Sequence, residues 1–202
     1  GEIGEEFFNE VGGIASVETF VFKDRAAGSD GKILRALKHA DGIFIAGGDQ
    51  SRYVRWWRGT PVAEALDAHV RAGKPLGGTS AGLAMLGEYL YGAMDGGSQI
   101  SPRALADPLG SSNTIEMDFL HIELLKGIIT DTHFSERNRL GRLIAFVAKG
   151  ESLAGHPLLG IGVDEDAAVA VDAKGAARVF ATAAGAGATI VKGGFATQVE
   201  DE

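Results

Sequence analysis

The sequence predicts an α/β protein, and two observations lead to that class. Short apolar segments rich in β-branched residues alternate along the chain with longer segments whose apolar residues recur at helical spacing. The chain has 202 residues, and a chain of this length buries roughly 70% of its unfolded surface, which is enough for one sizeable core. No internal repeat or linker interrupts it, so we expect residues 1–202 to form one domain.

The composition excludes several classes of function. The formal net charge is −8 and no run of Lys or Arg occurs, so the basic footprint of a protein that binds nucleic acid or an anionic membrane is missing. The absence of cysteine excludes disulfides, thiolate metal sites and a cysteine nucleophile. No apolar run is long enough to span a membrane, and Glu2, Glu5 and Glu6 stand where a secretory signal would be basic and then apolar. We therefore expect a soluble, cytoplasmic protein.

The first residues predict a helix and then a strand. Ile3, Phe7 and Val11 have helical spacing, and two glycines follow them as a stop. Residues 14–22 contain the β-branched and aromatic side chains typical of a strand. Because an α/β sheet ordinarily has a strand before its first helix, we expect that residues are missing upstream and that the sheet lacks its first strand.

The next elements lead to a strand end near the middle of the chain. Periodicity predicts a helix over residues 30–39, a short apolar strand over 42–46, and helices over 53–57 and 62–72. Gly59, Thr60 and Pro61 separate the last two helices. The chain then enters a second apolar strand that ends near Gly78.

The second half of the chain continues with a loop, a helix and several strands. Residues 92–113 are rich in Gly, Ser and Pro and lack periodicity, which predicts a long surface loop of the kind that borders active sites. Residues 119–130 suit a strand, and a helix follows and ends at about Lys149. We expect two strands around an acidic corner between residues 160 and 171, and then a β-rich tail with glycine turns.

The residues around Ser80 predict a nucleophile elbow. A side chain that stands clear of a strand-to-helix turn needs a strained backbone and small residues two positions before and after it. Gly78 and Gly82 occupy those positions. The turn also places Ser80 at the start of an apolar helix, whose free N–H groups favour a developing oxyanion. Because the chain has 30 glycines, the pattern can also arise by chance. Whether the chain also offers a histidine and a carboxylate to activate Ser80 therefore decides between the two interpretations.

Candidate partners for Ser80 lie at other strand ends. A serine becomes nucleophilic when a histidine takes its proton and a carboxylate holds that histidine. His133 follows a strand-like segment, and Glu165 lies in the acidic corner between Asp164 and Asp166. The order serine, histidine, acid differs from that of the α/β-hydrolases. The three acids fit a solvated turn or a cation site equally well, so the sequence does not single out one of them.

The remaining histidines have ordinary structural interpretations. His39, His69 and His156 fall at polar helix or loop positions and are expected at the surface, whereas His121 lies in a strand-like stretch and fits a core position.

A second glycine-rich strand end is formed by Gly47, Gly48, Asp49 and Gln50. Its backbone N–H groups can face a ligand with no Cβ in the way, and together with the N–H of Ala81 they would complete a two-donor oxyanion hole. An ordinary βα turn is the alternative.

A basic cluster stands out in this acidic chain. Arg137, Arg139 and Arg142 follow His133, and helical spacing places Arg139 and Arg142 on one face. The cluster either grips a substrate carboxylate or forms salt bridges with surface acids.

Four of these segments together resemble the cyanophycinases and their relatives in the serine peptidase family S51. They are Gly47–Gln50, Gly77–Gly82, Asp131–Arg137 with the two later arginines, and Gly160–Glu165, and the match runs from about residue 40 to 171. The resemblance implies a flavodoxin-like, doubly wound and mostly parallel sheet with helices on both faces, similar to the class I glutamine amidotransferases.

The resemblance also assigns roles to individual residues. The family's nucleophile falls on Ser80, its base on His133 and its acid on Glu165, and its oxyanion turn falls on Gly48 and Asp49 beside Ala81. The positions that contact substrate in the family fall on Gln50, Asp131, Thr132, Arg137, Arg139 and Arg142.

The implied activity is hydrolysis of β-aspartyl (β-Asp-Arg) peptides through an acyl-enzyme, without metal or cofactor, by a protein that forms a homodimer. One departure concerns specificity, because Thr132 stands where cyanophycinases carry Gln and lacks the paired donor and acceptor of an amide. An α-aspartyl dipeptidase and a catalytically silent protein that binds aspartyl peptides are the alternatives. The family also has a strand and a glycine-rich turn ahead of the helix with which this chain starts.

Overall fold

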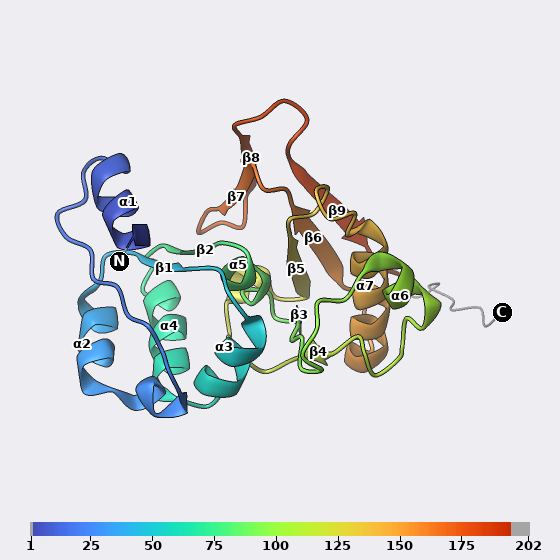
Figure 1. Ribbon diagram of the computed structural model, residues 1–202, viewed down its shortest axis with the longest axis horizontal. Coiled ribbons are helices and arrows are strands. Elements are labelled where there is room, and N and C mark those ends of the chain that lie inside the picture. The colour runs from blue at the N-terminus through green and yellow to red at the C-terminus, as the bar shows by residue number, and fades with distance from the viewer. Residues whose placement is uncertain (1, 195–202) are drawn as a thin grey trace.

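The computed structural model describes residues 2–194 and has a mixed α/β architecture, as the sequence predicts (Figure 1). Its α-helices are α1 (Glu2–Glu10), α2 (Gly31–His39), α3 (Gln50–Trp57), α4 (Pro61–Arg71), α5 (Ala81–Ala84), α6 (Ser101–Ala106) and α7 (Leu140–Ala154). Its strands are β1 (Ile43–Ile45), β2 (Leu76–Gly78), β3 (Leu90–Tyr91), β4 (Ile115–Glu116), β5 (Ile128–Thr132), β6 (Leu159–Val163), β7 (Ala167–Val171), β8 (Ala177–Ala181) and β9 (Ala188–Lys192). Short 3₁₀ turns occupy Arg25–Ser29 and Glu123–Leu125.

Two parallel strand pairs form the centre of the fold. β1 runs parallel to β2, and β5 runs parallel to β6. β9 adds to β6 in the antiparallel sense, while β3 pairs with β4 and β7 with β8, both antiparallel. In Figure 1, β1 and β2 lie with α2, α3 and α4 at one end of the molecule, and β5, β6 and β9 lie with α6 and α7 at the other. The β7–β8 hairpin projects beyond this body.

Each parallel pair has its own apolar core. The first core gathers Ile45, Trp57, Leu66 and Met85 with their neighbours around β1, α3 and α4. The second core gathers Tyr89, just before β3, with residues of β3, β5 and α7: Tyr91, Ile129, Leu143, Phe146 and Val147. Complete burial of one such side chain stabilises the fold by about 1.5–3 kcal/mol, so these two clusters hold the strand ends in place.

Local signals in the sequence account for the helix boundaries. Asp30 caps α2 by accepting hydrogen bonds from the N–H groups of Lys32 (2.7 Å) and Ile33 (3.2 Å). Asp49 caps α3 in the same way through Ser51 N (2.9 Å), and α7 ends at Gly155, whose φ of 71° is left-handed. The helix predicted over residues 30–39 is thereby confirmed.

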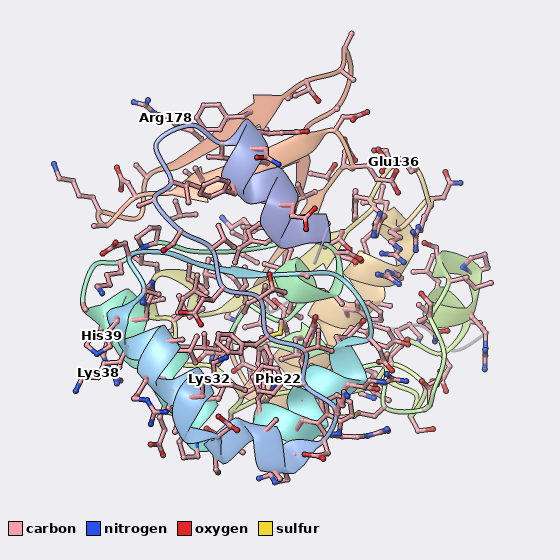
Figure 2. All side chains as sticks on the ribbon, turned by 60° about the vertical axis from the view of Figure 1, so that its left-hand side comes forward. Phe22, Lys32, Lys38, His39, Glu136 and Arg178 are labelled. Atoms are coloured by element: carbon pink, nitrogen blue, oxygen red, sulfur yellow. The ribbon has the colours of Figure 1, made fainter. Side chains whose placement is uncertain are left out.

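The outer and inner sides of α2 differ as its amphipathic pattern predicts. Lys38 and His39 point outward at the end of this helix, whereas Phe22 lies on its inner side (Figure 2). The ring of Phe22 is 5.0 Å from that of Trp57, centroid to centroid. The residues before α2 therefore extend the first core.

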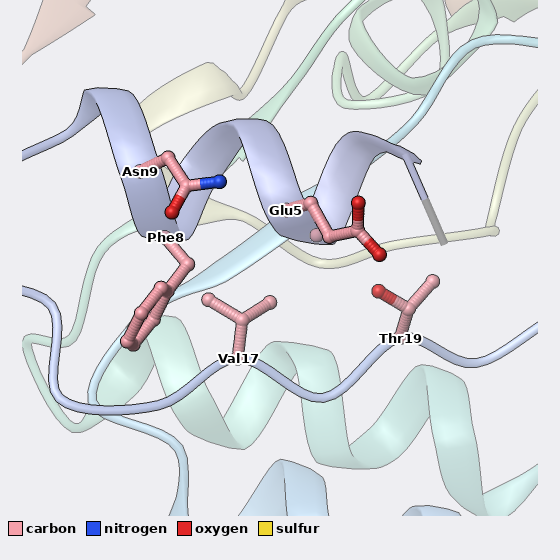
Figure 3. A pocket seen from close by; sticks show the side chains of 6 residues that line it. Glu5, Phe8, Asn9, Val17 and Thr19 are labelled. Carbon is pink, nitrogen blue, oxygen red and sulfur yellow. The ribbon is translucent and has the colours of Figure 1, made fainter.

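Residues 14–22 do not form the expected strand. In the part of the chain that the structure describes, this segment has no regular secondary structure and pairs with no strand, and Val21 is 77% exposed. A β-branched run becomes a strand only when a neighbour supplies a hydrogen-bonding ladder, and β1 pairs with β2 instead. A crevice of about 350 Å³ between α1 and this segment is lined by Glu5, Phe8, Asn9, Val17 and Thr19 together with Gly4 (Figure 3). It includes none of the predicted site residues.

The expected surface loop at residues 92–113 is partly helical and partly buried. It contains α6, and the fully buried Asn113 donates hydrogen bonds of 3.0–3.2 Å to three carbonyl oxygens between residues 104 and 108. The same side chain accepts a 2.8 Å hydrogen bond from Gln99. Such pairing between separated polar residues leaves no periodic pattern, which is why the sequence did not indicate it.

Two histidines occupy environments opposite to those expected. His69 is buried, its Nε2 lies 3.0 Å from the carbonyl oxygen of Pro75, and burial lowers its pKa. His121 is exposed and lies between Asp67 and Asp118, each 2.9 Å from one ring nitrogen. The hydrogen bonds to Asp67 and then to Asp118 raise the pKa of His121. Both environments come from long-range packing that local polarity does not reveal.

None of the helices in residues 2–194 combines the length and apolar character required to cross a bilayer.

Candidate active site

Ser80 sits on a strained turn between β2 and α5. Its φ and ψ are 51° and −121°, a conformation that a non-glycine residue adopts at a cost of order 1–3 kcal/mol. The small neighbours predicted from the sequence are required by contact. A Cβ on Gly78 would lie 2.4 Å from the carbonyl oxygen of Gly82, and a Cβ on Gly82 would lie 2.1 Å from that of Ile45. The tight turn thus presents Ser80 at the start of α5.

The side chains of Ser80, His133 and Glu165 form one hydrogen-bonded line. Ser80 Oγ lies 2.8 Å from His133 Nε2, and His133 Nδ1 lies 2.6 Å from Glu165 Oε1. These distances fit an imidazole that donates a hydrogen bond from Nδ1 to the carboxylate and accepts one from the serine hydroxyl at Nε2. The side chain of His133 is 21% exposed and that of Glu165 is 47% exposed, so Glu165 is the more solvent-exposed of the two.

The topology explains why residues so distant in sequence meet. In the parallel pair β5–β6, Thr132 is opposite Val163, so His133 and Asp164 follow at the same edge. Phe134 N donates to the carbonyl oxygen of Val163 at 3.2 Å, which holds together the segments that follow β5 and β6. The carboxyl ends of parallel strands form the ligand crevice in open α/β sheets.

Within the acidic corner, the structure distinguishes Asp164 from Glu165. Asp164 is 8% exposed, and its two oxygens accept hydrogen bonds from Ser135 N (2.9 Å) and Gly187 N (2.8 Å). Hydrogen bonding from Ser135 and then from Gly187 lowers the pKa of Asp164 against the opposing effect of burial. Asp164 therefore ties the His133 turn to the turn before β9, while Glu165 faces the imidazole.

We expect Asp164→Asn to destabilise the fold by about 2 kcal/mol, because an amide keeps only one acceptor and turns an NH₂ group toward a backbone N–H. For a chain of this size that corresponds to a melting temperature lower by about 4–8 °C at pH 7. The folded pKa lies below the ordinary value of 3.8, so the stabilisation is complete above that pH and is lost as pH falls through the folded pKa. Thermal melts from pH 7 to pH 3 should show the gap between the two proteins closing. Asp166→Asn, at the exposed neighbouring acid, is the control, and a gap that stayed constant with pH would contradict this role of Asp164.

The second glycine-rich turn lies against the serine. A Cβ on Gly47 would be 3.0 Å from Ser80 Cβ, and Gly48 has a φ of 145°, which favours glycine. Tyr53 holds the turn by donating to the carbonyl oxygens of Ala46 (2.8 Å) and Gly47 (3.2 Å). Ala81 is the first residue of α5, so its N–H has no acceptor within the helix.

A pocket of about 240 Å³ adjoins this turn. It is lined by residues from two segments: Gly48, Asp49, Gln50, Ala93, Gly96, Gly97 and Ser98. The side chain of Gln50 donates a long hydrogen bond of 3.4 Å to the carbonyl oxygen of Tyr91. The sequence predicts both sides of this pocket in outline: the glycine-rich turn after β1 forms one side, and the segment 92–113, expected to border an active site, supplies the other. No pattern singled out Ser98 individually.

The three arginines of the basic cluster occupy different environments. Arg137 is exposed, whereas the side chains of Arg139 and Arg142 are 9% and 3% exposed. Both buried arginines face Asp131, which contacts Arg142 through two hydrogen bonds and lies 3.7 Å from Arg139. Burial, and then the charge of Arg142, lower the pKa of Arg139 to about 10.

Thr132 is buried beside this cluster. Its carbonyl oxygen accepts a 2.7 Å hydrogen bond from Arg139, and its hydroxyl oxygen lies 3.4 Å from the same nitrogen. Among the described residues there is no group of three or more His, Asp or Glu side chains arranged to hold a metal ion.

Comparison with known proteins places these features in a family. The family model described as peptidase family S51 matches residues 21–179. A cyanophycinase from Synechococcus elongatus is 36% identical over 183 residues, covering 89% of this chain and 51% of the relative. A cyanophycinase from Trichormus variabilis is 36% identical over 162 residues, covering 79% and 48%. The chain thus spans about half the length of the curated relatives it matches.

A solved structure shows the same fold at low sequence identity. A peptidase E-like protein from Listeria monocytogenes EGD-e superposes with a TM-score of 0.52 at 16% identity, covering 83% of this chain and 71% of that one. The family match extends over most of the chain and includes the Ser80 turn, the His133 turn and the acidic corner. The chain belongs to peptidase family S51.

Proposed function

We propose that this chain is a serine-type peptidase that hydrolyses peptides at aspartyl residues, with Ser80 as its nucleophile. The observation that carries the proposal is the line from Ser80 Oγ through His133 to Glu165, with separations of 2.8 and 2.6 Å. Both distances lie within the range that proton transfer requires. The cyanophycinase relatives and membership of family S51 agree with this chemistry.

The geometry supports the following reaction. His133 Nε2 takes the proton of Ser80 Oγ as the oxygen attacks the scissile carbonyl carbon, and Glu165 stabilises the imidazolium that forms. The N–H of Ala81 and those of Gly48 and Asp49 receive the oxyanion. His133 then gives its proton to the leaving amine, which leaves an acyl-enzyme on Ser80. Water, deprotonated by the same imidazole, hydrolyses that ester and frees the serine.

The charges beside the pocket favour an acidic substrate. Two buried guanidinium groups, those of Arg139 and Arg142, face the single carboxylate of Asp131, so one positive charge is left uncompensated within this cluster. Arg139 also lies 3.4 Å from the hydroxyl of Ser98, which lines the pocket. We propose that this excess charge, with Gln50 and the exposed Arg137, attracts the free carboxylate of a β-aspartyl unit.

The linkage that is cleaved is the finer part of the proposal. We propose β-aspartyl-arginine peptides as substrates because the relatives are named as cyanophycinases. Thr132, beside the proposed base, has a shorter side chain than the Gln expected from the family pattern, so α-aspartyl dipeptides are the comparison substrates.

Labelling with a serine-reactive fluorophosphonate tests the proposal directly. We expect a covalent adduct that peptide mapping places on Ser80, formed at least about 100-fold more slowly in His133→Ala because the serine loses its base. Hydrolysis of β-aspartyl-arginine and α-aspartyl dipeptides, followed by chromatography, then assigns specificity. A folded protein that binds these peptides but forms no adduct would instead be a silent binding homologue, and the peptidase proposal would fail.

A further inference from the structure

Arg142 is fully engaged by the protein itself. Its Nε donates to Asp131 Oδ2 at 2.8 Å, its Nη2 donates to Asp131 Oδ1, and its Nη1 donates to the carbonyl oxygen of Gln99 at 3.0 Å. The guanidinium also lies 5.6 Å from the ring centre of Tyr91 and 5.5 Å from that of Phe146. Because the bidentate edge is taken by Asp131 and both side chains are 3% exposed, Arg142 has no free edge for a substrate carboxylate.

The third nitrogen of Arg142 reaches a segment that comes from elsewhere in the chain. We call residues 96–101 the wall loop, because Gly96, Gly97 and Ser98 form one side of the 240 Å³ pocket. Nη1 of Arg142 holds this loop at the Gln99 carbonyl and lies 3.4 Å from Ser98 Oγ. The backbone N–H of Arg142 also donates to Ser101 Oγ at 3.1 Å.

Arg142 has partners in holding the wall loop. The hydroxyl of Tyr91 donates to the carbonyl oxygen of Gly97 and accepts from Gln99 N, both at 3.1 Å. Ser101 Oγ donates to the carbonyl oxygen of Asn138 at 2.5 Å. Arg142 differs from these partners because its Asp131 contact connects the loop to the end of β5, one residue before Thr132 and two before His133.

We propose that Asp131 and Arg142 are positioning residues that hold the wall loop at a fixed distance from Ser80, rather than groups that contact substrate. Strand β5 sets the position of Asp131, and the two hydrogen bonds from Arg142 to Asp131 set the plane of the guanidinium. The guanidinium in turn holds the carbonyl group of Gln99, and with it the neighbouring Ser98. The second side of the pocket is thus set by the same strand that delivers His133. The inference rests on the proposed function only in taking this pocket as the substrate pocket.

Hydrogen exchange of the unliganded protein separates the two roles. In Arg142→Lys, which keeps the charge but loses the planar fork, we expect amide exchange in peptides covering the wall loop to accelerate at least about tenfold. Exchange in the core strands β5 and β6 should stay within about twofold of the wild type. Arg137→Lys, at the exposed arginine of the same cluster, is the matched control and should leave the wall loop unchanged. A residue that only binds substrate would not alter exchange in the free protein, so an unchanged wall loop in Arg142→Lys would overturn the proposal.

A kinetic measurement gives a second, independent readout. If Asp131 and Arg142 position the pocket, Arg142→Lys raises KM by about tenfold with a smaller effect on kcat. The increase in KM is then the same for a β-aspartyl peptide and for the peptide in which the free carboxylate of the β-aspartyl unit is amidated. If Arg142 gripped the substrate carboxylate, the penalty would vanish for the amidated form, and the proposal would be wrong. Failure of the peptidase proposal would appear as no turnover in the wild type and would leave the exchange result standing.

A double variant covers the case in which Arg142→Lys does not fold. Replacing a buried ion pair by apolar residues of similar volume is often tolerated, so Asp131→Leu combined with Arg142→Met is expected to fold. It has no donor for the Gln99 carbonyl, and we expect the same acceleration of wall-loop exchange. Protection equal to that of the wild type in this variant would also overturn the inference.

Discussion

Ser80→Ala is expected to reduce the hydrolysis of aspartyl peptides by at least about 10⁴-fold, because no acyl-enzyme forms without the nucleophile. The substitution keeps the Cβ on which the packing of the turn depends, so the melting temperature should change little. Initial rates with β-aspartyl-arginine and α-aspartyl dipeptides, together with a thermal melt, provide the measurement.

Ser152→Ala is a suitable control for that experiment. Ser152 is an exposed serine of α7, and its loss should leave the rate unchanged. If Ser80→Ala cleaved either peptide at the wild-type rate, Ser80 could not be the nucleophile, and the hydrogen-bonded line to Glu165 would need another explanation.

Gly82→Ala is expected to destabilise the fold strongly. The new Cβ would lie 2.1 Å from the carbonyl oxygen of Ile45 and 2.7 Å from that of Ala46. Both are backbone atoms of β1 and its exit, and they cannot move aside without breaking the β1–β2 pair. We expect a loss of more than about 4 kcal/mol of the free energy of unfolding, or failure to fold.

Urea denaturation followed by circular dichroism measures this effect. Gly42→Ala, which lies just before β1, is the matched control because its Cβ would meet nothing closer than 3.5 Å, an ordinary contact. A Gly82→Ala protein whose midpoint matched that of Gly42→Ala would show that the approach of α5 to β1 is looser than these distances indicate.

The parts of the fold that follow local rules could be predicted from the sequence. Asp30 before an apolar helical pattern gives α2, and the run over residues 42–46 gives β1 because both signals act within a few residues. The strand expected over residues 14–22 failed because a strand needs a partner, and pairing is a long-range property. The buried hydrogen bonds within residues 92–113 could not be predicted for the same reason, since Asn113 and Gln99 come into contact only after the chain has folded.

The candidate site was predictable to the extent that parallel strands deliver their ends to one place. The strand-end pattern predicts Ser80 and His133, the resemblance adds Glu165 from the acidic corner, and the structure brings the three side chains into contact. The choice between Asp164 and Glu165 depended on which carboxylate the N–H groups of Ser135 and Gly187 occupy, which no pattern shows. For Arg142, spacing indicated a shared helix face with Arg139, but not which acceptor its guanidinium would meet.

The two parallel strand pairs of the fold have a mechanical consequence. Ser80 belongs to the β1–β2 end of the molecule, whereas His133 and Glu165 belong to the β5–β6 end. The 2.8 Å contact between Ser80 and His133 therefore crosses the boundary between the two cores, while the 2.6 Å contact to Glu165 does not. The hydroxyl of Thr130 in β5 donates to the carbonyl oxygens of Leu83 (2.9 Å) and Ala84 (3.2 Å) in α5. These hydrogen bonds connect the two halves at this boundary. A slip of about 1 Å between the halves would lengthen the Ser80–His133 contact past hydrogen-bonding reach and leave His133 paired with Glu165. The proposed activation of Ser80 would therefore depend on how well the two halves are aligned.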